Sequence, residues 1–167
     1  HSRRTRTHEP VDVSADAAGT VIIRGGQLMM TNATISADTV ENDGAPVAVD
    51  IQLTGDLTMT DTQGSSAITA RTTGPGNAGE VQLSSENFIV TSSSLDSPFA
   101  IIDTHTSGSG AAGNVNVTTR ETIHATGENA GDMYLIDSGT IGEKGGQGGD
   151  VTIAAKQLQL TDANINT

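Results

Sequence analysis

Short stretches in which apolar and polar residues alternate recur along the whole chain. The clearest unit, Gly149–Thr167, contains three of them, which begin at Val151, Leu158 and Ile165. Alternation with a period of two residues predicts a β-strand with one buried face. Three strands this short bury little surface alone, so the unit requires neighbours built like itself.

Such neighbours fill the rest of the sequence. The segment Ala18–Ala37 aligns with the last unit position by position, and Gly79–Leu95 aligns again. The aligned apolar positions are Val21, Ile23, Leu28, Met30 and Ile35 in the first segment, Val81, Leu83, Phe88, Val90 and Leu95 in the second, and Val151, Ile153, Leu158, Leu160 and Ile165 in the last unit. Two looser copies are Ile51, Leu53, Leu57, Met59 and Ile68, with a first linker one residue shorter, and a unit that opens with Val115 and Val117. A repeat of about 30 to 36 residues is typical of a solenoid.

Stacking the units predicts the fold. We expect an all-β, right-handed parallel β-helix of about five three-stranded coils over residues 18–167, preceded by an N-terminal arm, lead-in or linker over residues 1–17. Val11 and Val13 are expected to form a partial strand in this lead-in. The predicted columns are Val21, Ile51, Val81, Val115 and Val151, then Ile23, Leu53, Leu83, Val117 and Ile153, and on the third strand Ile35, Ile68, Ile102, Ile136 and Ile165. The last coil has no successor to cover it, so we expect the domain to be a fragment of a longer chain.

Two local features of the repeat lead to further expectations. The spacing predicts that coils differ in length after the third strand, in glycine-rich returns such as residues 74–79 and 145–149, where glycine permits tight and positive-φ turns. In the fourth coil Thr122 and His124 stand at the expected apolar positions, with Ile123 between them. Either this strand turns Ile123 inward, which we predict, or His124 is buried.

Composition excludes several classes of protein. The net charge is −12 and the pI about 4.4, which argues against binding to nucleic acid, because phosphates require a basic surface. No apolar run is long enough to span a bilayer. Cysteine is absent, so the fold relies on stacked strands rather than on disulfides. The basic arm at residues 1–7 has no apolar segment behind it and is interpreted as a linker or cloning remnant.

Three phrases of the sequence resemble a known family. Residues 23–39, 74–83 and 145–167 are similar to the repeat region of filamentous haemagglutinin-like exoproteins, the passengers of bacterial two-partner secretion. The resemblance covers residues 18–167 and implies a right-handed parallel β-helix that is secreted to the surface of a Gram-negative type bacterium. It also implies export through a partner outer-membrane β-barrel transporter, and adhesion to host-cell, surface or glycan ligands. The NPNG-type motif of the family's secretion domain is missing, so this segment would be a downstream part of the shaft.

Two short motifs suggest chemistry but lack its context. Residues 145–153 look like a calcium-binding nonapeptide, yet such motifs work in tandem and a single copy is present, so we interpret them as a return loop. Asp103, His105 and Ser107 would point to one face of a strand. A serine hydrolase also needs an oxyanion hole and a strained nucleophile turn, and neither is recognisable, so an exposed strand edge is the favoured interpretation.

The alternative function is that of a carbohydrate-active β-helix enzyme, a polysaccharide lyase or glycoside hydrolase. Its candidate catalytic residues are Asp103, Asp132, Asp137, Glu143 and Lys144, and Asp103 is expected to stack near Asp137 of the adjacent coil. Aromatic residues, which form sugar-binding platforms, make up only 2% of the chain. We therefore expect a structural and adhesive module with no catalytic residues, no cofactor and no metal.

Overall fold

The chain folds into a parallel β-solenoid with three sheets. The computed structural model describes residues 10–61, 66–93, 99–128, 133–142 and 146–167, and in these residues every regular element is a strand. The first sheet contains β2 (Val21–Gly25), β5 (Val47–Leu53), β8 (Glu80–Ser85), β11 (Val115–Thr119) and β14 (Val151–Ala154). The second sheet contains β3 (Leu28–Thr31), β6 (Leu57–Asp61), β9 (Phe88–Ser92), β12 (Thr122–Gly127) and β15 (Gln157–Thr161). The third sheet contains β1 (Val11–Asp12), β4 (Thr34–Ser36), β7 (Ala67–Thr69), β10 (Phe99–Asp103), β13 (Met133–Asp137) and β16 (Ala163–Asn166).

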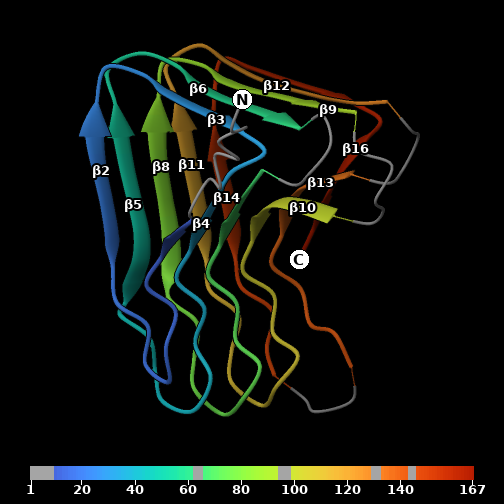
Figure 1. Ribbon diagram of the computed structural model, residues 1–167. Helices are drawn as coiled ribbons and strands as arrows, with labels where there is room; N and C mark the ends of the chain where they lie inside the picture. Colours follow the sequence, from blue (N-terminus) through green and yellow to red (C-terminus); the bar gives the residue numbers. More distant parts are fainter. Residues whose placement is uncertain (1–9, 62–65, 94–98, 129–132, 143–145) are drawn as a thin grey trace, which may run out of the picture.

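Each strand pairs in parallel with its equivalent one coil away, so the three sheets run side by side along the solenoid (Figure 1). The solenoid makes about four turns, slightly fewer than the five coils that the repeat predicts. The short β1 extends the third sheet by pairing with β4, which confirms the partial strand in the lead-in. The right-handed sense of coiling stays a prediction.

The isoleucine column of the third sheet is confirmed. The strand registers join Ile35 to Ile68, Ile68 to Ile102, Ile102 to Ile136 and Ile136 to Ile165. The three central isoleucines have no exposed surface. Burying such a side chain contributes about 1.5 to 3 kcal/mol, so this column is a major source of stability. The column residue of the third coil is therefore Ile102, while Leu95 lies outside the described residues.

The predicted register of the second coil is wrong by two residues. Val21 pairs with Val49, and Ile23 pairs with Ile51, so Val49 and not Ile51 belongs to the first column. Val47, Val49, Ile51 and Leu53 alternate in the sequence, and a slip of two residues keeps the same face buried, although Val47 itself lies at a register shift and is only partly buried. The hydrophobic pattern therefore cannot choose between the two registers.

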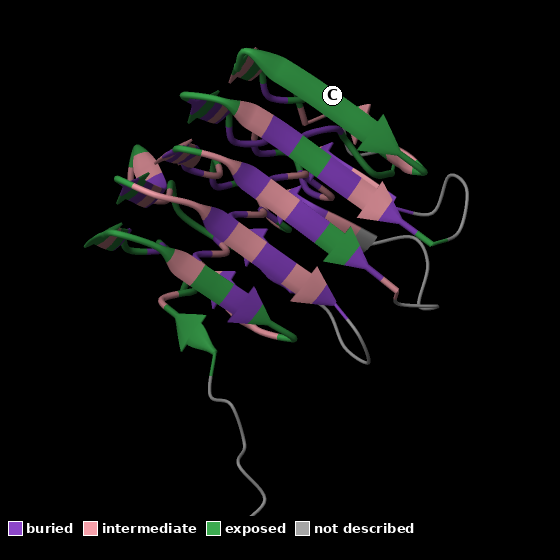
Figure 2. Ribbon diagram, turned by 90° about the horizontal axis from the view of Figure 1, so that it is seen from above, coloured by how far each residue is buried: buried purple, intermediate pink, exposed green. Residues whose placement is uncertain are grey.

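The inversion predicted for the fourth coil is confirmed. Ile123 pairs with Phe88 and Leu158 and has no exposed surface, whereas His124 points outward next to Thr126. Figure 2 shows the buried and exposed positions that alternate along this sheet, and the exposed last strand, β15.

The largest differences in coil length lie between the second and third strands, whereas the connections after the third strand, where the repeat predicts the differences, vary by only two residues. From the column residue of the third strand to the next first strand the chain takes 13 to 15 residues, as from Ile68 to Val81 and from Ile136 to Val151. From the second strand to the third it takes 5 residues in the first and last coils and 9, 12 and 11 residues in the coils between. The added lengths include residues 62–65, 94–98 and 129–132, which lie outside the described residues.

The glycine-rich returns stack on one another, and close approach explains their glycines. A Cβ on Gly110 would lie 2.0 Å from the carbonyl oxygen of Gly76, and one on Gly108 would lie 2.1 Å from that of Gly74. Among the described glycines, only Gly142 has a positive φ, so the sequence-based explanation from turn geometry does not apply to most of them. The returns are compact, backbone-packed layers.

Candidate functional site

A ladder of polar side chains follows the outer face of the third sheet. One row of the ladder lies at the ends of the strands and consists of Asp12, Ser36, Thr69, Asp103, Asp137 and Asn166. A second row lies two residues after the first, just beyond the strand ends, and includes Asp38, Arg71 and His105. The isoleucines point inward at the preceding position, so alternation places both rows outside the solenoid.

The carboxylates of the first row bond the backbone where each strand ends. Asp12 Oδ1 accepts the Ser14 backbone N–H at 2.9 Å, and Asp137 Oδ1 accepts that of Gly139 at 3.1 Å. The repeated bond between an aspartate and the residue two positions on is a structural reason for aspartate in this row.

Charged side chains link neighbouring coils. Arg71 donates to Asp38 Oδ2 through Nε at 3.0 Å and Nη2 at 2.6 Å, and its Nη1 lies 3.9 Å from Asp103 Oδ2. Burial lowers the pKa of Arg71, but the hydrogen bond and charge of Asp38 and the charge of Asp103 outweigh it, and the pKa is raised overall. The guanidinium is therefore a permanent cation paired mainly with Asp38.

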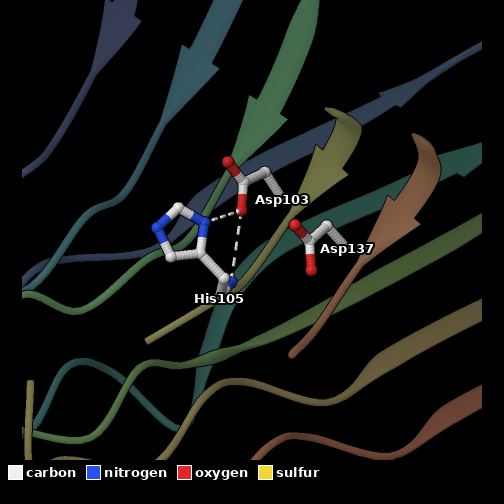
Figure 3. A group of neighbouring side chains, drawn as sticks. All are labelled: Asp103, His105 and Asp137. Carbon is white, nitrogen blue, oxygen red and sulfur yellow. Dashed lines mark hydrogen bonds and ion pairs between the residues drawn. The ribbon is translucent and has the colours of Figure 1, made fainter. Parts of the chain in front are cut away.

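The densest part of the ladder is the group Asp103, His105 and Asp137, here named the aspartate–histidine cluster (Figure 3). His105 Nδ1 lies 2.6 Å from Asp103 Oδ1, and one ligand atom from each of the three residues falls within 4.8 Å of the others. The hydrogen bond to Asp103 raises the pKa of His105, burial opposes the rise, and the charges of Asp103 and Asp137 add to it. The cluster can hold a cation between two neighbouring coils.

Thr69 lies beside this cluster with an unused hydroxyl group. It is the register partner of Asp103, and it is only 5% exposed. Among the described residues, no hydrogen-bond partner reaches Thr69 Oγ1. A buried hydroxyl without a partner costs about 1 to 3 kcal/mol, so this position favours a ligand or water at the cluster.

The structure brings together only some of the predicted site residues. The expected stacking of Asp103 near Asp137 is confirmed, because the two residues are register partners on β10 and β13. Asp132, Glu143 and Lys144 lie outside the described residues. Ser107 shares the outer face with His105, but no hydrogen bond joins it to His105 in the described part of the chain, so a serine triad is not assembled. Sequence reasoning missed Asp38 and Arg71, although each follows a column isoleucine by three residues, as His105 does.

A second unusual carboxyl group lies inside the solenoid. Asp61 ends β6 and is 1% exposed, and neither carboxylate oxygen meets the geometry of a hydrogen bond to any described residue. Burial raises the pKa of Asp61 to about 6, although the nearby backbone N–H of Ser66 opposes the rise. Sequence reasoning missed this residue as well. The sequence signal for its burial is that Asp61 occupies the next inward position after Met59 in a strictly alternating strand.

The outer face of the first sheet carries a shallow depression of about 230 Å³. Its polar lining includes Asp50, Gln52, Glu80, Gln82 and Asn116. These side chains are already paired, since Gln82 Nε2 donates to Glu80 at 3.1 Å, Asn116 donates to the same carboxylate, and Gln52 donates to Asp50 at 3.2 Å. These polar side chains of the depression therefore already form hydrogen bonds with one another.

Comparisons with known proteins found no relative of this chain. No family model, no curated protein and no solved structure matches it. The described residues also contain no helix that is long and apolar enough to cross a membrane.

Proposed function

We propose that this chain is a structural and adhesive segment of a secreted, filamentous haemagglutinin-like exoprotein. The observation that carries the proposal is the regular parallel solenoid whose coils keep one core while one connection, between the second and third strands, varies most in length. Repeating coils form a stiff shaft, and variable connections on one side of a solenoid commonly carry binding differences. The resemblance of the repeat phrases to such exoproteins supports the same interpretation.

The location of the length differences sharpens the proposal. The three longer connections all join the second sheet to the third, so they emerge along one edge of the shaft. Contact with host-cell, surface or glycan ligands is assigned to this edge. The glycine-rich returns have backbone atoms in contact from coil to coil, which leaves them little freedom to diversify.

Adhesion is tested with beads coated with the chain, on cultured cells and on a panel of immobilised glycans. A trimmed variant replaces the three longer connections with the five-residue spacing found between Met30 and Ile35. We expect the native chain to attach above an albumin-coated control and the trimmed variant to lose most of that attachment. A second variant that changes only exposed Met29 and Ile22 on the sheet faces should attach normally.

Circular dichroism checks that both variants keep the β-sheet signal. Equal attachment of the native and trimmed chains would contradict the assignment to this edge. Attachment no greater than that of albumin on every surface would contradict the adhesive function itself.

A carbohydrate-active β-helix enzyme is the second candidate, because Asp103 and Asp137 meet across neighbouring coils. Paired carboxylates perform acid and base steps in glycoside cleavage. This candidate predicts release of reducing or unsaturated sugar ends from polysaccharides, and loss of that release in Asp103→Asn. Product formation that persists in Asp103→Asn would rule out this pair as its source.

A further inference from the structure

We propose that the aspartate–histidine cluster binds one divalent transition-metal ion on the outer face of the third sheet. Zn²⁺ is taken as the representative ion. Asp103, His105 and Asp137 offer one imidazole nitrogen and two carboxylate oxygens. This mixed nitrogen and oxygen set is one that zinc accepts from three protein ligands, with water in the fourth position. The site is independent of the adhesive function.

Charge favours a divalent cation at this place. The Arg71 guanidinium makes two short contacts to Asp38 and only a 3.9 Å contact to Asp103, on the oxygen that faces away from His105. The other donors to Asp137 are neutral, namely the Gly139 backbone and the Asn166 amide at 3.0 Å. Two carboxylates therefore stack on neighbouring coils with one imidazole as their nearest shared partner, and a charge of +2 balances them.

The distances permit coordination after small side-chain movements. Ligand atoms bound at about 2.0 Å to a tetrahedral ion lie about 3.3 Å apart. His105 Nδ1 and Asp103 Oδ1 are 2.6 Å apart and would separate slightly, and the remaining ligand atoms, now within 4.8 Å, would approach by up to about 1.5 Å. Rotation about the side-chain torsions supplies such movements without a change of backbone register.

A second observation concerns Thr69, on the strand that flanks Asp103 on the side away from Asp137. The hydroxyl group of Thr69, the register partner of Asp103, is buried and has no partner among the described residues. A water molecule in the fourth coordination position would supply one, because metal-bound water donates strong hydrogen bonds. One ion thus explains the ligand set, and its bound water would have to reach past Asp103 to pair with the hydroxyl.

Metal binding would connect β10 to β13 and so join two coils that are 34 residues apart in the register. An ion bound by the folded chain alone raises the melting temperature in proportion to the logarithm of its free concentration. The site would act as a clip between two coils, at the ends of β10 and β13 where the glycine-rich returns begin.

The experiment uses the whole chain, treated with a chelator and then dialysed into a non-coordinating buffer. Zn²⁺ is titrated by calorimetry, and bound metal is counted by elemental analysis. Co²⁺ is then substituted to record the visible bands of its ligand field. We expect one tightly bound equivalent, and a loss of affinity of about tenfold or more in His105→Gln and in Asp137→Asn.

The matched control is His124→Gln, which removes an exposed histidine on another sheet that is bonded to Thr126. The control should keep the full equivalent and the Co²⁺ spectrum. Circular dichroism confirms that each variant is folded, and Asp137→Asn preserves the shape of the side chain. One equivalent of metal retained by folded His105→Gln would overturn the proposal and assign the ion elsewhere, and so would absence of binding by the native chain.

Discussion

The buried carboxyl group of Asp61 should make the stability of the solenoid depend on pH. Its pKa is raised by burial from about 3.8 to about 6. A difference of this size between the folded and unfolded chains corresponds to about 3 kcal/mol. Because the folded-state pKa is the higher one, the contribution of Asp61 to stability is most favourable below about pH 4, declines as the pH rises towards 6, and its full cost is present above 6.

Replacement of Asp61 by Asn removes the charge and preserves the shape of the side chain. Near pH 3, below both pKa values, the native carboxyl is mostly protonated in both states, so the variant and the native chain should have similar free energies of unfolding. At pH 8 the variant should be more stable by about 2 to 3 kcal/mol, because no charge has to remain buried.

The measurement is urea-induced unfolding of both chains at half-unit steps from pH 3 to pH 8, followed by circular dichroism. Only the difference between the two free energies is interpreted, since the effects of the other carboxyl groups cancel in it. Thr60→Ser, on the outer face of the same strand, is the control and should give a difference that is constant with pH. A constant difference for Asp61→Asn, or lower stability of that variant at pH 8, would refute the reasoning.

Two further substitutions test the packing. Gly110→Ala should lower the free energy of unfolding by about 2 kcal/mol or more in a urea titration, because the added Cβ would lie 2.0 Å from Gly76 O. Gly26→Ala is the control and should have little effect, because its Cβ would meet no atom within 4 Å. Equal effects of the two alanines would contradict close stacking of the returns. Phe88→Ala should cost about 3 to 5 kcal/mol in the same titration, since Phe88 has no exposed surface, and Met29→Ala, at 75% exposure, should cost less than about 0.5 kcal/mol. A small cost for Phe88→Ala would show that the second sheet is not packed as described.

The fold was largely predictable because the apolar positions repeat and alternate. The isoleucine column needed only the recurrence of one residue type, and the inversion at Ile123 followed from the single large apolar residue available in that strand. The register of Val49 and Ile51 was not predictable, because both choices bury the same face. The added length of the third coil was misplaced because Leu95 fits the repeat five residues after Val90, whereas the column residue is Ile102.

The candidate site was predictable in part. Asp103 and Asp137 each follow a column isoleucine by one residue, so the repeat alone predicts that they stack. The partners of His105 depend on side-chain torsions and on which cation approaches Asp103. The alternation of apolar and polar residues in the sequence determines neither of these. The position of Asp61 inside the core was hidden by its charge, because inward positions are expected to be apolar.

The outer ladder explains how a repetitive shaft can acquire a specific site. In most coils the row position holds a residue such as Asp12, Ser36 or Thr69, and its role there is to end a strand or bond the neighbouring backbone. Two successive coils carry aspartate, and this coincidence places two negative charges about one inter-strand spacing apart. His105, two residues further on, then completes a set of three ligands. In a solenoid every position recurs at a fixed spacing, so the choice of residue in two neighbouring coils is sufficient to change a structural row into a chemical site without any change in the fold.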